Sequence, residues 1–393
     1  MSVKKKLSIL LRLLRVQLSD SKNINLFFEL LRFGLFPERA FKGATFIESD
    51  EVSWDEVYRL AEEQSVVGII ATGLDIYKVQ NHGVNIPQEW ALQFIGSSLQ
   101  LEQRNKAMND FIGVLMRQLR AAGVYALLVK GQGIAQCYEN PLWRASGDVD
   151  LLLNTDNYKR AKEFLCRFAT SIEEENIHKH LGMTVDGWTV ELHGTLRSGS
   201  LKKMDAVVDK TQEATFYEGQ VRAWRNGETD IFLPEENNDV IFVFTHIVKH
   251  FFHEGIGLRQ ICDWCRLLWT FKDSLNRKLL ETRINDAGLK TEWLVFAAFA
   301  VDYLGIPEEA MPLYETSKKW SNKANKLLFF ILMTGNFGHN RDLSYYQKQP
   351  RFQQKFLSFK RHSSDAVKRF RIFPKDTITV WCRMFVSGIK VLG

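Results

Sequence analysis

Two aspartates in the stretch GDVDLLL, residues 147–153, are the side chains whose spacing most clearly suggests chemistry. Asp148 and Asp150 are separated by one residue, so on a β-strand both carboxylates point to the same face. The leucines that follow are expected to anchor the strand in a core and hold both acids at its start. Neighbouring carboxylates repel each other unless a cation neutralises them, and Mg²⁺ takes carboxylate oxygens together with substrate phosphates. A metal site is therefore favoured over the simpler alternative, a turn in which the second aspartate occurs by chance.

A third carboxylate follows in the stretch MTVDGWTVELHGTL, residues 183–196. Asp186-Gly187 is a strong hairpin signal between two alternating strands. In the second strand the apolar residues share one face, which leaves Glu191 and His193 on the other. If this hairpin extends the sheet that carries the two aspartates, Glu191 joins them. His193 is then either a base beside the acids or a hydrogen-bonded strand histidine.

The turn Lys130-Gly131-Gln132-Gly133 separates a short apolar strand from a short helix. Its backbone amides, close to a helix N-terminus, would cradle phosphate, and Lys130 would add a cation. Arg144 lies between this turn and the aspartates, and a guanidinium can bind phosphate through two hydrogen bonds. Alternatively, Arg144 balances the carboxylates without touching substrate.

His246, His250 and His253 recur at helical spacing in the stretch THIVKHFFHEG. Two histidines four residues apart on a helix can bind zinc, but the glutamate that a zinc protease of this type needs is absent. The missing glutamate therefore argues against a zinc protease. Ordinary surface or packed histidines explain the pattern as well as a metal site does.

The next helical stretch carries two further pairs of reactive or charged residues. Cys262 and Cys265 have no second cysteine pair at zinc-ribbon spacing, so they indicate two residues on a helix face. Arg259 and Asp263 are four residues apart, which suits an ion pair within one helix. A structural role is therefore expected first for this pair and a role in a site second.

In the order of these motifs the chain resembles the nucleotidyltransferase superfamily typified by DNA polymerase β and kanamycin nucleotidyltransferase. More narrowly, it resembles the bacterial group usually called uncharacterised nucleotidyltransferases. That group tends to show a lysine-glycine turn, a tyrosine at the end of the next helix, an arginine and an Asp-x-Asp pair. The corresponding residues here are Lys130-Gly131, Tyr138, Arg144, and Asp148 with Asp150. The resemblance is good over residues 100–196 and extends over most of residues 30–270.

The resemblance implies an enzyme that uses two Mg²⁺ ions and a nucleoside triphosphate (NTP). It implies a metal-binding and catalytic triad of Asp148, Asp150 and Glu191. The turn departs from the usual superfamily pattern, in which a hydrophobic residue precedes Gly-Gly or Gly-Ser. The residues expected to hold nucleotide are Lys130, Gly131, Gln132, Gly133 and Arg144, and the candidates for the acceptor pocket are Tyr138, His193, His246 and His250.

The expected reaction is transfer of a nucleoside monophosphate from NTP to an acceptor, with release of pyrophosphate. A small molecule is the favoured acceptor. The atypical turn supports one alternative, a non-catalytic relative that binds nucleotide or a partner protein. The three carboxylates argue against it, because a binding module has no need to gather acids around polyphosphate. A third interpretation is an RNA-directed transferase that contacts RNA through the basic segment, residues 351–376.

Composition bounds the remaining possibilities. The net charge of the 393-residue chain is +6, and the same surplus lies within the basic segment, residues 351–376, where phenylalanines are interleaved. Such a segment can contact nucleic acid, although a solvated helix face with a buried aromatic stripe is commoner. No apolar run approaches the ~18 residues of a membrane-spanning helix. Five scattered cysteines favour a reducing, cytoplasmic location over a disulfide framework.

The helices and strands expected to position these residues indicate an α+β protein. A small mixed β-sheet, flanked by helices, would form the nucleotidyltransferase core in residues 100–234. Helical regions would occupy residues 1–99 and residues 235–393. Ser53 with Glu56 matches a capping box, a long helix is expected from Gln88 to about Ala122, and Asn226-Gly227 marks another hairpin.

Overall fold

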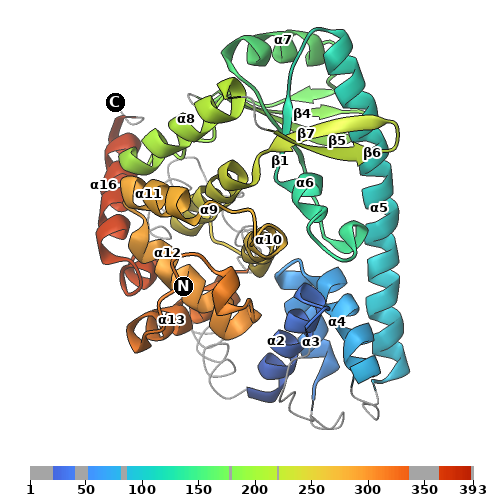
Figure 1. Ribbon diagram of the computed structural model, residues 1–393, viewed down its shortest axis with the longest axis vertical. Helices are drawn as coiled ribbons and strands as arrows, with labels where there is room; N and C mark the ends of the chain where they lie inside the picture. Colours follow the sequence, from blue (N-terminus) through green and yellow to red (C-terminus); the bar gives the residue numbers. More distant parts are fainter. Residues whose placement is uncertain are drawn as a thin grey trace.

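A computed structural model describes residues 21–39, 52–80, 86–176, 179–218, 221–335 and 363–390. Figure 1 shows a sheet at one end of the molecule, helical layers at the other, and the long helix α5 running along both. The first helices are α2 (Ser21–Leu35), α3 (Trp54–Glu63), α4 (Val67–Gln80) and α5 (Gln88–Ala121). The predicted cap is present, because the Ser53 side chain accepts a hydrogen bond from the Glu56 backbone amide at the start of α3.

The main sheet has five strands in the order β1-β2-β5-β4-β3. Its strands are β1 (Leu127–Val129), β2 (Val149–Leu152), β3 (Ser171–Ile172), β4 (His180–Val185) and β5 (Trp188–His193). The β2–β5 pair is parallel and the other pairs are antiparallel, which confirms the predicted mixed sheet. A separate hairpin is formed by β6 (Val221–Asn226) and β7 (Thr229–Pro234). The connecting helices are α6 (Gly131–Ala135), the 3-10 turn η2 (Pro141–Trp143), α7 (Thr155–Leu165) and α8 (Lys202–Tyr217).

Alternating residues along β2 and β5 point to opposite faces of the sheet, one toward the core and the other toward the acids. Val149 and Leu151 of β2 pack with Val190 and Leu192 of β5 into the core beneath α5 and α7. The intervening acids therefore leave from the opposite face. The hairpin before β5 turns at Asp186-Gly187, where both φ angles are positive at 49° and 80°, as a type I′ turn requires.

A second and larger core lies in the helical part, where the elements after the sheet pack on α2, α3 and α4. Its centre holds the buried aromatics Phe244, Trp264, Trp293 and Phe296. The elements are α9 (Glu236–His253), α10 (Leu258–Thr270), α11 (Arg277–Ala287), α12 (Lys290–Phe299), the π-helical turn η3 (Ala300–Leu304), the 3-10 turn η4 (Glu308–Ala310), α13 (Lys318–Thr334) and α16 (Pro374–Lys390).

The basic segment is only partly described. Residues 351–362 lie outside the described residues, whereas residues 363–370 form a helix that precedes α16. Within the described part, Phe373 is buried in the helical core. Arg369 is buried as well, and its Nη1 donates a hydrogen bond to the backbone oxygen of Phe252 at 2.5 Å. Phe370 and Val367 are exposed, so this part divides between core packing and surface.

None of the helices in the described part of the chain is both long and apolar enough to span a bilayer. The five cysteines are all free thiols. Cys262 and Cys265 lie buried in α10, where burial raises the pKa of both thiols. Their interpretation as two packed helix residues agrees with this placement.

His253 at the end of α9 gives stability a predictable pH dependence. Its Nε2 lies 2.7 Å from Ser200 Oγ, and burial, followed by the charge of Arg369, lowers the pKa of His253 from 6.5 to about 4. The unfolded chain therefore binds a proton between these values that the folded chain does not, so stability rises with pH across this window. We expect the free energy of unfolding to fall as pH drops from about 6.5 to about 4, by at most about 3 kcal/mol from this group.

Urea denaturation at pH 7 and pH 5 measures this effect. His253→Gln keeps a polar partner for Ser200 but does not titrate, so it should flatten the dependence. An equally steep dependence in His253→Gln would show that another group is responsible.

Candidate active site

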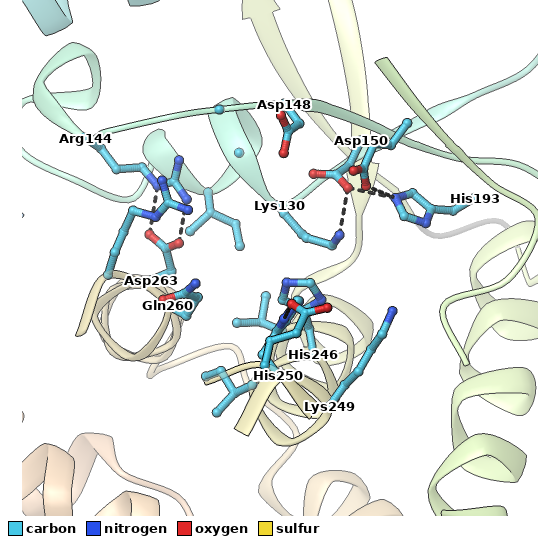
Figure 2. Close-up of a pocket in the computed structure, with 18 of the residues that line it drawn as sticks. Lys130, Arg144, Asp148, Asp150, His193, His246, Lys249, His250, Gln260 and Asp263 are labelled. Carbon is cyan, nitrogen blue, oxygen red and sulfur yellow. Dashed lines mark hydrogen bonds and ion pairs between the residues drawn. The ribbon is translucent and has the colours of Figure 1, made fainter. Parts of the chain in front are cut away.

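A cavity of about 360 Å³ lies between the main sheet and the helices α9 and α10. Figure 2 shows the strand ends on one side of it and the side chains of α9 and α10 on the other. The turn before α6 and the loop before β2 close its remaining walls. Most of the residues predicted for the site line it, namely Lys130, Gly131, Arg144, Asp148, Asp150, Glu191, His193, His246 and His250.

Three carboxylates share the sheet side of this cavity. Asp150 of β2 lies directly opposite Glu191 of β5 in the parallel register, and Asp148 comes just before β2. Asp150 is 8% exposed, whereas Asp148 is exposed. Burial, then the charges of Glu191 and Asp150, raise the pKa of Asp148 above its ordinary value. The repulsion expected between three gathered acids is therefore present at the most exposed of them.

Two groups neutralise Asp150. Lys130 Nζ and His193 Nε2 each lie 2.7 Å from the same atom, Asp150 Oδ1. Burial works to raise the pKa of Asp150, but the charge of Lys130 and the hydrogen bond from His193 outweigh it and lower the pKa. The pKa of Lys130 is raised in turn, because the charges of Asp150 and Glu191 overcome the effect of its burial. The Lys130 ammonium group thus lies among the carboxylates, at a position where their negative charges attract a cation.

Glu191 is held by two histidines, of which one was not predicted. His180 Nε2 lies 3.0 Å and His193 Nε2 lies 3.3 Å from Glu191 Oε2, and the two rings stack with centroids 4.8 Å apart. Burial favours a raised pKa for Glu191, but these hydrogen bonds lower it below its ordinary value. The sequence did carry a signal for His180, because counting outward from the Asp186-Gly187 turn pairs it with His193.

The backbone at the turn is in an unusual conformation that directs Lys130 into the cavity. Lys130 has φ of 59° and Gly131 has φ of 43°, both in the region that favours glycine. A Cβ added at Gly131 would lie 3.4 Å from the backbone oxygen of Asp148, so the turn packs closely against the strand entrance. A non-glycine residue held at positive φ is a strained arrangement of a kind that clusters at functional sites.

Arg144 is engaged by a partner far along the chain. Its Nε donates to Asp263 Oδ1 at 2.8 Å and its Nη2 to Asp263 Oδ2 at 2.6 Å, while Nη1 donates to Ala145 O and Ser146 Oγ. Tyr138 also donates its hydroxyl to Asp263 Oδ1 at 2.8 Å. The guanidinium fork is therefore used to attach the loop before β2 to α10, rather than left open for phosphate.

Three residues predicted for the site do not line the cavity. The Gln132 side chain is buried, and its Nε2 donates to Asn105 Oδ1 of α5 at 2.8 Å. Gly133 faces β7, where an added Cβ would lie 2.8 Å from Leu233 Cδ2. Tyr138 is buried behind Arg144 against α10. The reason is that the short helix α6 is packed between α5, β7 and α10, so that of its residues Gly131 and Ile134 reach the cavity.

The helical wall of the cavity carries charges of both signs, with Lys249 and Arg259 as cations and Glu254 and Asp263 as carboxylates. On α9, His246 and His250 pack edge to face with ring centroids 4.2 Å apart, and His250 Nδ1 pairs with Glu254 Oε2 at 2.8 Å. Lys249 lies beside them, and Arg259 of α10 donates from Nη1 to Ala145 O at 3.0 Å. Burial and the charge of Arg144 lower the pKa of Arg259 to about 10.

Sequence reasoning missed part of this wall, namely Lys249, Glu254 and Gln260. Helical spacing from His246 identifies Lys249 as a neighbour three residues on. His253 was grouped with the other two histidines by the same spacing, but it hydrogen-bonds Ser200 and does not line the cavity.

The donor set fits magnesium. Asp148, Asp150 and Glu191 supply carboxylate oxygens to one cavity, and such oxygens are the ligands that Mg²⁺ takes in proteins. The position of the Lys130 ammonium among them shows that the arrangement favours positive charge. Among the described residues, the three donors whose ligand atoms all lie within 4.8 Å of one another are His180, Glu191 and His193, whereas the three carboxylates do not form such a group. Imidazole nitrogens suit transition metals better, so the histidines are better explained as hydrogen-bond partners of Glu191.

Comparison with protein families adds an independent observation. A family model described as uncharacterised nucleotidyltransferase matches residues 50–305, which is more than half of the chain. The chain belongs to this family. The match covers every residue that lines the cavity of this nucleotidyltransferase family member. Neither the curated proteins nor the solved structures gave a match.

Proposed function

We propose that this nucleotidyltransferase family member transfers a nucleoside monophosphate from NTP to a small-molecule acceptor in the presence of Mg²⁺. The observation that carries the proposal is the arrangement of the cavity. Three carboxylates lie at adjacent strand ends, and Lys130 beside them and Arg259 on the facing helix supply positive charge around a space of about 360 Å³. A polyphosphate bound through cations to the acids would have its remaining charge balanced by Lys130 and Arg259.

In this proposal Asp148, Asp150 and Glu191 would together hold two Mg²⁺ ions. Bound Mg²⁺ would supply charge stabilisation to the attacking and leaving oxygens of an in-line displacement. The bond that forms joins the acceptor oxygen to the α-phosphorus, and the bond that breaks releases pyrophosphate. The acceptor proton passes to a nearby base, for which Glu191 is the candidate because its carboxylate lines the cavity on the side assigned to the acceptor.

The other residues act by binding and orienting. Lys130 and the Gly131 amide are placed to hold the β- and γ-phosphates, and Arg259 and Gln260 extend the same wall. His180 and His193 fix the carboxyl orientation of Glu191. The Arg144–Asp263 pair holds the loop that presents Asp148, so we assign Arg144 a positioning role.

The test of the function uses the full chain, Mg²⁺ and each of the four NTPs labelled at the α-phosphate, mixed with a fractionated metabolite pool. Transfer moves the label into a new compound and releases one unlabelled pyrophosphate per transfer. Label that leaves only as free nucleoside monophosphate would indicate hydrolysis. If neither transfer nor hydrolysis is observed, and Mg²⁺ with NTP does not change the melting temperature, the proposal is refuted.

Lys130 offers a separate prediction about nucleotide binding. Lys130→Ala should weaken NTP affinity by about tenfold or more, because a charge-assisted hydrogen bond contributes about 1.5–3 kcal/mol. The variant should also be less stable without metal, since Asp150 loses its partner, and Mg²⁺ should restore more stability to it than to the parent. Calorimetric titration and thermal melts measure both effects.

Lys159→Ala, at an exposed position on α7, is the matched control and should leave NTP affinity unchanged. Parental affinity in Lys130→Ala would make the turn a structural corner without a role in nucleotide binding.

A further inference from the structure

A second, smaller cavity of about 150 Å³ adjoins the first. The two share five lining residues, namely Lys130, His180, His193, His246 and Lys249. The rest of the second cavity is contributed mainly by the segment after β5, including Thr195, Arg197 and Ser198. It therefore opens on the His193 side of the acids, away from the Gly131 turn and from Arg144.

The two cavities differ in charge. The first is lined by five carboxylates, those of Asp148, Asp150, Glu191, Glu254 and Asp263. The second has no aspartate or glutamate among its described lining residues, and instead presents lysines, an arginine, histidines and hydroxyl groups. A space with cations and hydrogen-bond donors but without carboxylates suits an anion. The first cavity suits a metal-bound polyphosphate, so the difference separates two kinds of ligand.

Lys249 is not paired with any carboxylate among the described residues, although the charges of Glu254, Glu191 and Asp150 attract it. Within the described residues its ammonium makes no hydrogen bond or ion pair, whereas Lys130 pairs with Asp150 and Arg197 pairs with Asp209. Figure 2 shows Lys249 extending from α9 toward the strand end that carries His193. Burial, then repulsion from Lys130, lower the pKa of Lys249. A mostly buried cation next to another cation is unfavourable by itself, and a bound anion would offset that cost.

The location indicates which substrate supplies the anion. Two of the candidate phosphate-binding groups, Gly131 and Arg259, line only the first cavity, whereas Lys130 lies between the two cavities and lines both. Glu191, the acid proposed for the acceptor side, is hydrogen-bonded by His180 and His193, which line both. An acceptor whose oxygen lies near Glu191 would therefore extend past these histidines into the second cavity.

We propose that the second cavity binds an anionic group of the acceptor, a phosphate or a carboxylate, with Lys249 as its main cationic contact. This inference rests on the proposed function, because it assigns the anion to the acceptor of nucleotidyl transfer. It narrows the acceptor class to hydroxylated small molecules that carry a negative charge. A neutral sugar or a neutral amino alcohol lacks the group that this cavity is built to bind.

The test measures binding of three matched probes, namely glycerol phosphate, glycerate and glycerol, to the full chain. Titrations are run with Mg²⁺ and a non-hydrolysable NTP already bound, so that the nucleotide side is filled. We expect one or both anions to bind and glycerol not to bind, and comparison of the two anions distinguishes phosphate from carboxylate. Lys249→Met should weaken anion binding by about 10- to 100-fold, the range of a charge-assisted hydrogen bond.

Two further measurements separate this inference from the proposed function. Lys249→Met should keep the rise in melting temperature that Mg²⁺ and NTP give the parent, and it should be at least as stable as the parent without ligand. Lys210→Met, at an exposed position on α8, is the matched control and should bind the anion normally.

Each contrary result has a distinct meaning. If NTP displaces the anion, the second cavity belongs to the triphosphate and the inference is overturned while the proposed function stands. Anion binding that is equal in Lys249→Met and the parent overturns it as well. A marked loss of stability in Lys249→Met would show that the lysine is a structural partner of the acids instead. Absence of any thermal response of the parent to Mg²⁺ and NTP would count against the proposed function itself.

Discussion

Replacing Asp148 and Asp150 together with asparagine should reduce nucleotidyl transfer by about 10³-fold or more. Loss of metal ligands removes several kcal/mol of charge stabilisation in the transition state, and each ~1.4 kcal/mol is a factor of ten in rate. The same variant should lose the rise in melting temperature that Mg²⁺ and NTP together give the parent. Labelled-NTP transfer and thermal melts with each ligand alone and with both measure these effects.

The control for this variant is Asp186→Asn, which makes the same chemical change at the exposed turn of the β4–β5 hairpin. The double variant should still fold but be less stable than the parent: loss of the Asp148 charge relieves repulsion, whereas loss of the Asp150 charge leaves Lys130 without its partner. A circular dichroism spectrum like that of the parent establishes this. A folded double variant with the full thermal response to Mg²⁺ and NTP would remove both aspartates from the metal site.

Asp263→Ala should be the most destabilising single change near the cavity, by about 3–5 kcal/mol, because it leaves a buried charge without its partner. Arg144 and Asp263 are 4% and 7% exposed at their side chains, and Tyr138 loses its hydrogen-bond acceptor at the same time. Urea denaturation measures the loss. Asp273→Ala, whose side chain is 89% exposed, is the matched control and should change stability little.

A double variant tests whether the pair itself matters. Arg144→Met with Asp263→Leu removes both charges, so it should be more stable than Asp263→Ala alone. Transfer activity should nevertheless stay low in the double variant, since the loop that presents Asp148 would no longer be attached to α10. Activity restored along with stability would show that the pair holds the fold but does not position the acid.

Local patterns in the sequence were enough for the sheet side of the site. The Asp186-Gly187 turn has the φ angles that its residues predict, and alternation from there places Glu191 away from the core. The step from the hairpin to the aspartates depended on a parallel pairing of β2 with β5, which lies beyond local patterns. Only the family resemblance supported that step before the structure was known.

The partners of the charged residues were harder to predict, because they lie far apart in the sequence. Arg144 and Asp263 are separated by 119 positions, and no local rule connects a loop before one strand with a distant helix. Gln132 is a residue for which the local pattern gave the wrong location. The sequence of its turn predicts a phosphate-binding loop, but the packing of α6 against α5 directs its side chain into the interior. Packing between elements, rather than local propensity, decided both outcomes.

The position of the cavity between two separately packed layers has a practical consequence for work with fragments. Its acids come from β2 and β5, whereas Lys249 and Arg259 come from the helices that follow residue 235. A recombinant fragment limited to residues 100–234 would therefore present the acids to water, with their facing cations missing. It would also uncover apolar surface on the sheet and on α6, which invites aggregation. Residues 50–305, the range of the family match, include both walls but lack α2, α13 and α16, which pack in the helical core, so the full chain is the better starting point.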